Sequence, residues 1–121
     1  MISQNTWRGW VSLIAILIMG ATISQAADVR DFQAFNNTGR QIKSLKVSAH
    51  ESEVWGPNVL GLQVLPNGYQ TTISFNPQVP TSCWYDFKLI FADGSTETYT
   101  QGWNVCMYTE IHFYDGYLRA L

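Results

Sequence analysis

The sequence has few charged residues and no cluster of basic ones. Only 13% of its 121 residues are Asp, Glu, Lys or Arg, with nine acidic residues against seven basic ones. Proteins that bind nucleic acid usually carry a basic patch, so nucleic acid is a poor candidate partner. Aromatic residues make up 14% of the chain. A chain that is poor in charge and rich in aromatics is expected to fold.

Catalytic signatures are also missing. The chain has two histidines and two cysteines, and no Gly-x-Ser-x-Gly, phosphate-loop or zinc motif occurs. His50 stands near Glu51 and Glu53, but without a second set of metal ligands we interpret this stretch as a solvated polar loop. Glu110 and His112 are the candidate acid and base of a small hydrolase. We expect a protein that is not an enzyme and uses no metal or cofactor.

Residues 1–26 have the features of a secretory signal peptide. Arg8 is the only charge before Asp28, residues 11–19 are almost wholly apolar, and Ser24-Gln25-Ala26 suits a signal peptidase. The alternative is an uncleaved anchor, but the apolar run is shorter than the roughly 20 residues that span a bilayer. We therefore predict cleavage after Ala26.

The predicted mature chain, residues 27–121, forms a single domain. Loss of Arg8 leaves six basic residues against nine acidic ones, a net charge of −3. We expect this domain in the periplasm or outside the cell, and not on a membrane. In such a compartment a cysteine pair usually oxidises, so Cys83 and Cys106 are predicted to form one structural disulfide.

The clearest strand is the run from Cys83 to Phe91. Its odd positions are apolar or aromatic, whereas its even positions include Asp86 and Lys88. This alternation predicts a central strand with one buried face. Asp86 is predicted to be structural, accepting hydrogen bonds from a neighbouring loop or pairing across strands. Asp93-Gly94 predicts the turn that ends the strand.

Further runs predict strands on both sides of the central one, at residues 32–35, 41–48, 69–75, 95–100 and 105–114. Residues 36–39 are predicted to be a hairpin loop, and the parity change between Ile42 and Leu45 predicts a bulge. In the last strand we expect Met107, Ile111 and Phe113 to face inward, and Tyr108, Glu110, His112 and Tyr114 to face outward. Together, six or seven short strands and one disulfide predict an all-β, antiparallel β-sandwich of Greek-key or immunoglobulin-like type.

The least regular segment covers residues 49–68, and a connection this long is often functional. Residues 57–61 are consistent with one helical turn, and residues 62–65 with a short strand. Trp55 is the large residue of this segment. Its ring either pins the loop to the sandwich, which we favour, or contacts a ligand.

Several short motifs resemble a family of small exported bacterial β-proteins, most of which have no assigned function. They are Asn37-Thr38-Gly39, Trp55-Gly56, Leu60-Gly61, Cys83, Tyr85-Asp86, Asp93-Gly94 and Asn104-Val105-Cys106, together with Ile42, residues 45–48, Leu65, Gly68 and Phe91. The resemblance implies a secreted β-sandwich and no particular reaction. The family often has acidic residues where this chain has Asn58 and Gln63, which argues against a cation site here.

Three functions are consistent with the sequence. The first is a non-catalytic module that binds a protein or peptide through the 49–68 loop or a sheet edge. The second is a carbohydrate-binding module that uses exposed aromatic rings, and the third is the hydrolase around Glu110 and His112. The candidate binding residues are Trp55, Asn58, Trp84, Trp103, Tyr108 and Tyr114.

Overall fold

The computed structural model of the chain describes residues 28–52, 54–75 and 82–121. The predicted signal peptide lies outside these residues. Within them the chain forms strands and turns only, and none of it is a helix long and apolar enough to cross a membrane. The strands are β1 (Phe32–Asn37), β2 (Ile42–Ala49), β3 (Gln70–Ile73), β4 (Trp84–Phe91), β5 (Thr96–Asn104), β6 (Glu110–Tyr114) and β7 (Tyr117–Ala120).

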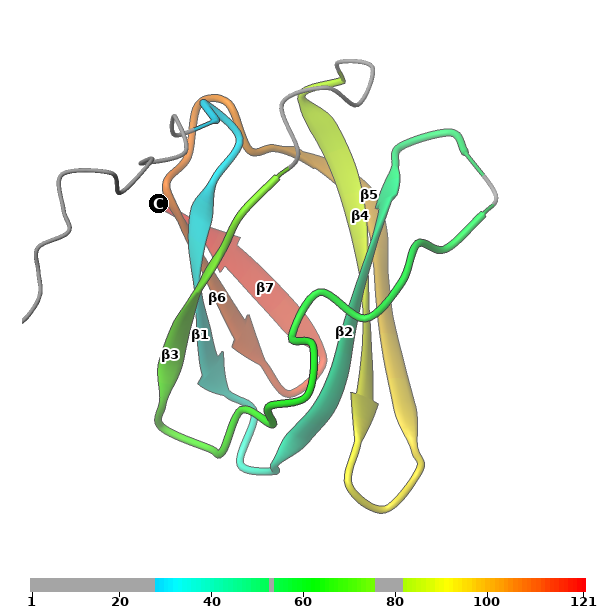
Figure 1. Cartoon of the computed structure of the whole chain (residues 1–121), viewed down its shortest axis with the longest axis vertical. Coiled ribbons are helices and arrows are strands. Elements are labelled where there is room, and N and C mark those ends of the chain that lie inside the picture. The colour runs from blue at the N-terminus through cyan, green and yellow to red at the C-terminus, as the bar shows by residue number, and fades with distance from the viewer. Residues whose placement is uncertain (1–27, 53, 76–81) are drawn as a thin grey trace, which may run out of the picture.

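The strands form two sheets that face one another (Figure 1). Sheet A has the order β3-β1-β6-β7, and sheet B has the order β2-β4-β5. The predicted all-β sandwich is therefore confirmed, with seven strands and one disulfide. One pairing differs from the expected antiparallel arrangement, because β1 and β6 are parallel. Parallel neighbours need a long crossover, which strands β2 to β5 provide.

The core lies between the sheets, and β4 is at its centre as predicted. Tyr85, Phe87, Leu89 and Phe91 are all buried. The Phe87 ring meets Phe32 of the opposite sheet edge-on, with ring centroids 5.6 Å apart. Each fully buried side chain of this size contributes roughly 1.5–3 kcal/mol. The predicted bulge is also confirmed, because the β2–β4 register shifts between Ile42 and Ser44.

The prediction of a hairpin at residues 36–39 is wrong. Strands β1 and β2 belong to different sheets, so this turn carries the chain across the sandwich. The cause is Asn36, which is fully buried. Its side-chain amide donates to the carbonyl oxygens of Arg40 (2.7 Å) and Leu65 (2.8 Å), and its Oδ1 accepts from Thr38. The amide thus satisfies backbone groups that a hairpin would have paired.

The end of the chain differs from the prediction of one strand over residues 105–114. Residues 105–109 form a turn built on Asn104, whose side chain accepts from the Cys106 amide. Met107, expected to face inward, is instead 68% exposed, whereas Ile111 and Phe113 are buried as expected. The chain then turns back as β7, a strand that we did not predict.

Cys83 and Cys106 form the predicted disulfide. Their Cα atoms are 5.3 Å apart, within the range that a disulfide can bridge. The bond joins the start of β4 to the turn that follows β5. It therefore fixes the place at which the chain leaves sheet B for sheet A.

The segment between β2 and β3 lies along the outer edge of β2. The amides of Gly56 and Val59 donate to β2 carbonyl oxygens at 3.1 and 2.8 Å, and Leu60 and Leu65 are buried in the core. Neither the helical turn at residues 57–61 nor the strand at 62–65 forms, because the backbone is committed to β2 or to tight turns. The segment covers the free edge of β2.

Candidate functional site

The six candidate binding residues are spread over the molecule. Trp84 lies on the outer face of sheet B and is 52% exposed. Trp103 is half-buried and packs on Phe87 and Tyr99, with ring centroids 6.0 and 6.3 Å apart. Tyr108 is half-buried in the turn before β6. These three residues thus come from sheet B and from the turn before β6.

Trp55 and Asn58 belong to the segment that covers β2. Trp55 is half-buried. Asn58 has a structural role, because its Oδ1 accepts from the amides of Leu45 (2.9 Å) and Leu60 (3.0 Å) and its Nδ2 donates to the Gly61 carbonyl at 3.1 Å. The side chain of Asn58 is therefore occupied by the fold itself.

Tyr114 is joined by a residue that we did not predict. Its ring stacks on Tyr117 with centroids 4.8 Å apart and ring planes 8° apart. The two residues face each other across the β6–β7 hairpin. Because Tyr114 covers one face of the Tyr117 ring, the exposed 54% of Tyr117 consists of its other face and its edges. This pair makes a rigid aromatic platform at the edge of sheet A.

A groove of about 250 Å³ lies beside this platform, between β5 and β7. We call it the β5–β7 groove. It is lined by Thr98, Tyr99, Thr100, Gln101, Trp103, Gly116, Tyr117 and Leu118. The lining thus combines three aromatic residues with hydroxyl and amide groups, and none of its side chains carries a formal charge.

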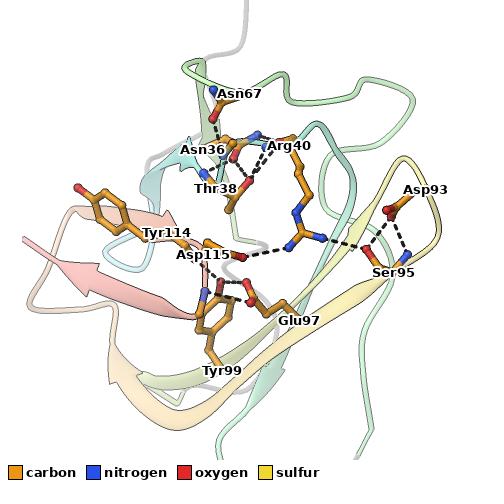
Figure 2. Close-up of polar contacts among 12 residues, drawn as sticks. Asn36, Thr38, Arg40, Asn67, Asp93, Ser95, Glu97, Tyr99, Tyr114 and Asp115 are labelled. Carbon is orange, nitrogen blue, oxygen red and sulfur yellow. Dashed lines mark hydrogen bonds and ion pairs between the residues drawn. The ribbon is translucent and has the colours of Figure 1, made fainter.

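A hydrogen-bonded bracket holds the two walls of the groove together (Figure 2). The Tyr99 hydroxyl shares its proton between Glu97 Oε1 (2.7 Å) and the Tyr114 carbonyl oxygen (3.0 Å). The Gly116 amide donates to Glu97 Oε2 at 3.0 Å. Burial, and then the hydrogen bond to Glu97, raise the pKa of Tyr99 well above its usual value. Tyr99 therefore stays a neutral donor.

Arg40 closes the same end of the sandwich. Its guanidinium lies 3.6 Å from the centre of the Phe91 ring and donates to Ser95 Oγ and Asp115 Oδ1 at 3.0 and 3.3 Å (Figure 2). These contacts connect the β4–β5 and β6–β7 turns. The bracket and Arg40 together fix the position of Tyr117 relative to β5.

The expectation that His50 belongs to a solvated polar loop is wrong. Its Nδ1 lies 2.9 Å from Asp86 Oδ1, and the residue Asp86 is only 7% exposed. Asp86 was predicted to accept hydrogen bonds from a neighbouring loop. Its partner does come from the neighbouring segment, but it is the side chain of His50. Gly102 lies directly against the imidazole. No cluster of three His, Cys, Asp or Glu side chains suited to a metal ion occurs in the described part of the chain.

Glu110 and His112 form a pair on the outer face of sheet A. His112 Nε2 lies 2.9 Å from Glu110 Oε1, and the His112 ring stacks on Phe35 with centroids 4.1 Å apart. The structure thus brings together the two side chains that the hydrolase hypothesis paired. The stacking also gives the pair a packing role at the surface of the sheet.

Comparisons with protein families, with curated proteins and with solved structures found no match to this chain. The candidate site therefore depends on geometry alone. Sequence reasoning placed Trp103 and Tyr114 among the candidates but missed Tyr117, Thr98, Thr100 and Gln101. The dipeptide Asp115-Gly116 was the available signal, because it predicts a hairpin that would put Tyr114 opposite Tyr117.

Proposed function

We propose that this protein is an exported, non-catalytic binding module that holds a saccharide ring in the β5–β7 groove. The observation that carries the proposal is the Tyr114–Tyr117 stack beside a groove lined with hydroxyl and amide groups. An aromatic face offers a surface for the C–H side of a sugar ring. Thr98, Thr100 and Gln101 offer partners for the sugar hydroxyls.

The size and charge of the groove favour a neutral sugar. At about 250 Å³ it is slightly smaller than the range of roughly 300–1,000 Å³ found for drug-sized ligands, and it suits a single ring. Its lining has no formal charge, so an ionic sugar would lose hydration without gaining a partner. The groove is also pre-formed, because the bracket around Glu97 needs no ligand.

Export follows from the predicted signal peptide and is supported by the disulfide, since such bonds persist in oxidising compartments. We place the mature protein in the periplasm or outside the cell. The non-catalytic assignment is supported by the positions of the histidines. His50 and His112 each face a carboxylate, and neither lines the groove.

The test is a glycan array probed with wild-type protein, followed by calorimetry with the sugars that bind. We expect Tyr117→Ala to weaken binding about tenfold or more, equivalent to about 1.4 kcal/mol. Tyr69→Ala is the matched control, because Tyr69 is 65% exposed and lies outside the groove. Equal binding by both variants and wild type would refute the groove.

A second candidate function is supported by the β5 edge. Phe91 and Ser95 form a hydrogen-bonded pair, and bonded pairs alternate along an antiparallel ladder. Thr96 and Thr98 therefore direct their backbone N–H and C=O groups away from β4. An extended peptide could pair with this edge. We prefer this edge to the 49–68 loop for a protein partner, because that loop is committed to β2.

One variant separates the two candidates. Thr96→Pro removes an outward donor without breaking a bond to β4, at a residue that does not line the groove, and proline is tolerated on edge strands. We expect it to leave sugar binding unchanged. Loss of a peptide ligand in Thr96→Pro, with no binding on the glycan array, would replace the saccharide proposal by the peptide one.

A further inference from the structure

His50 is held in place more firmly than a surface histidine needs. Its backbone N–H donates to the Trp84 carbonyl oxygen at 2.8 Å, which extends the β2–β4 ladder by one pair. Its Nδ1 lies 2.9 Å from Asp86 Oδ1. Gly102, at φ +80°, lies so close that a Cβ there would be 3.0 Å from His50 Cγ. The backbone bond thus places the residue, and Asp86 and Gly102 fix the ring.

This arrangement determines which nitrogen faces outward. The atoms nearest Gly102 are Cγ, Nδ1 and Cδ2, and Nδ1 points to Asp86. The exposed 35% of the side chain therefore belongs to the edge that carries Nε2. With its proton on Nδ1, a neutral imidazole offers Nε2 as an acceptor. In this tautomer His50 presents a fixed hydrogen-bond acceptor at the surface.

Trp84 stands beside this acceptor on the outer face of sheet B. Ala49 is paired with Tyr85, so the next pair along the ladder is His50 with Trp84. Side chains directly opposite on antiparallel strands have Cβ atoms roughly 4.5–5.5 Å apart. Trp84 is 52% exposed. An exposed aromatic ring and a fixed polar group therefore lie together, the same combination as in the β5–β7 groove.

The two sites are joined through one short piece of β5. Gly102 lies beneath His50, whereas its neighbours Gln101 and Trp103 line the groove. Successive residues of a strand point to opposite faces. The edge of β5 at residues 101–103 is thus the boundary between the Trp84–His50 site and the groove.

We propose that the ligand is a neutral oligosaccharide that passes over this edge, with one ring in the β5–β7 groove and another on Trp84 and His50. The ring in the groove stacks on Tyr117. A hydroxyl of the second ring donates to His50 Nε2 while its C–H face lies on Trp84. Asp86 holds the imidazole in the accepting tautomer. This inference rests on the proposed saccharide-binding function and specifies the length of the ligand.

The experiment is calorimetry with linear oligomers of one to six residues. The probes are β-1,4-glucose, α-1,4-glucose, β-1,4-N-acetylglucosamine and mannose oligomers. For the sugar that binds, wild-type affinity is expected to rise at least tenfold from one residue to the longest oligomer. Trp84→Ala and His50→Ala should reduce the oligomer affinity at least fivefold and leave the single-residue affinity unchanged. Tyr117→Ala should weaken both.

The experiment has a control variant, and its contrary outcomes separate this inference from the proposed function. Met107→Ala is the control for Trp84→Ala, because Met107 is also well exposed, at 68%, and should change nothing. Thermal unfolding of each variant checks the fold, and Trp84→Ala keeps the test valid if His50→Ala is unstable. Affinity independent of length, with Tyr117 still required, overturns this inference alone. Failure of every probe to bind wild type overturns the proposed function as well.

Discussion

Gly102→Ala is the sharpest test of how this fold is held together. Gly102 has φ +80°, a backbone conformation that costs an L-residue roughly 1–2 kcal/mol. The new methyl group would also meet the His50 ring at 3.0–3.2 Å. The ring must then shift by a few tenths of an ångström, which weakens its contact with Asp86. A buried polar group left without its hydrogen bond costs about 1–3 kcal/mol.

Gly94→Ala is the matched control. Gly94 lies in the turn of the same β4–β5 hairpin and has φ +89°, but no atom lies within 4 Å of a Cβ at that position. It should lose only the backbone part, about 1–2 kcal/mol. Gly102→Ala should lose more than this, up to about 5 kcal/mol for complete loss of the contact with Asp86. In a domain of this size each kcal/mol lowers Tm by about 4–8 °C.

The assay is urea or thermal unfolding followed by circular dichroism. A double-mutant cycle with His50→Ala isolates the clash, because Gly102→Ala in the His50→Ala background should cost no more than Gly94→Ala. Equal destabilisation by Gly94→Ala and Gly102→Ala in the wild-type background would refute the role assigned to the His50–Gly102 contact.

Two further predictions concern the disulfide and the acid response. Replacing Cys83 and Cys106 together by serine should remove roughly 3 kcal/mol of stability by the loop-entropy relation, measured as a shift in the urea midpoint; a double variant as stable as wild type would contradict this. A hydrogen bond from the buried Arg30 lowers the pKa of Asp28 from 3.8 to about 2, so its stabilising contribution is present above about pH 4 and is lost as pH falls through about 2. Asp28→Asn should abolish this part of the acid response, and identical pH profiles between pH 2 and 5 for variant and wild type would disprove it.

The central part of the fold was predictable because its signals are local. The alternation along β4 requires only that one face be buried, and the structure buries Tyr85 to 7% exposure and Leu89 completely. To predict the disulfide between the two cysteines, one needs only an oxidising compartment and a plausible loop length. Gly39 and Gly94, each in a turn signal, have positive φ. Each of these features is decided within a few residues.

Features that depend on contacts between distant segments were not predictable. Residues 36–39 have the composition of a hairpin loop, and only the buried bonds from Asn36 to Arg40 and Leu65 show that the chain crosses between sheets. Met107 has the parity of an inward residue. It is exposed because residues 105–107 form a turn, in which the alternation of a strand does not apply.

The candidate site was hidden for the same reason. Asp86 occupies an outward position by alternation, yet it is buried because β5 is irregular beside it. Tyr85 pairs with Trp103, and Phe87 pairs with Tyr99. The step between these two pairs therefore covers two residues of β4 but four residues of β5, which is a bulge in β5. This bulge places Gly102 where His50 can lie on it and cover Asp86. A single strand pattern cannot reveal such an arrangement, because it requires the end of β2, the middle of β4 and the bulge of β5 at once. The groove likewise needs the β6–β7 hairpin to lie beside β5, so both parts of the proposed ligand surface arise from the packing of β5.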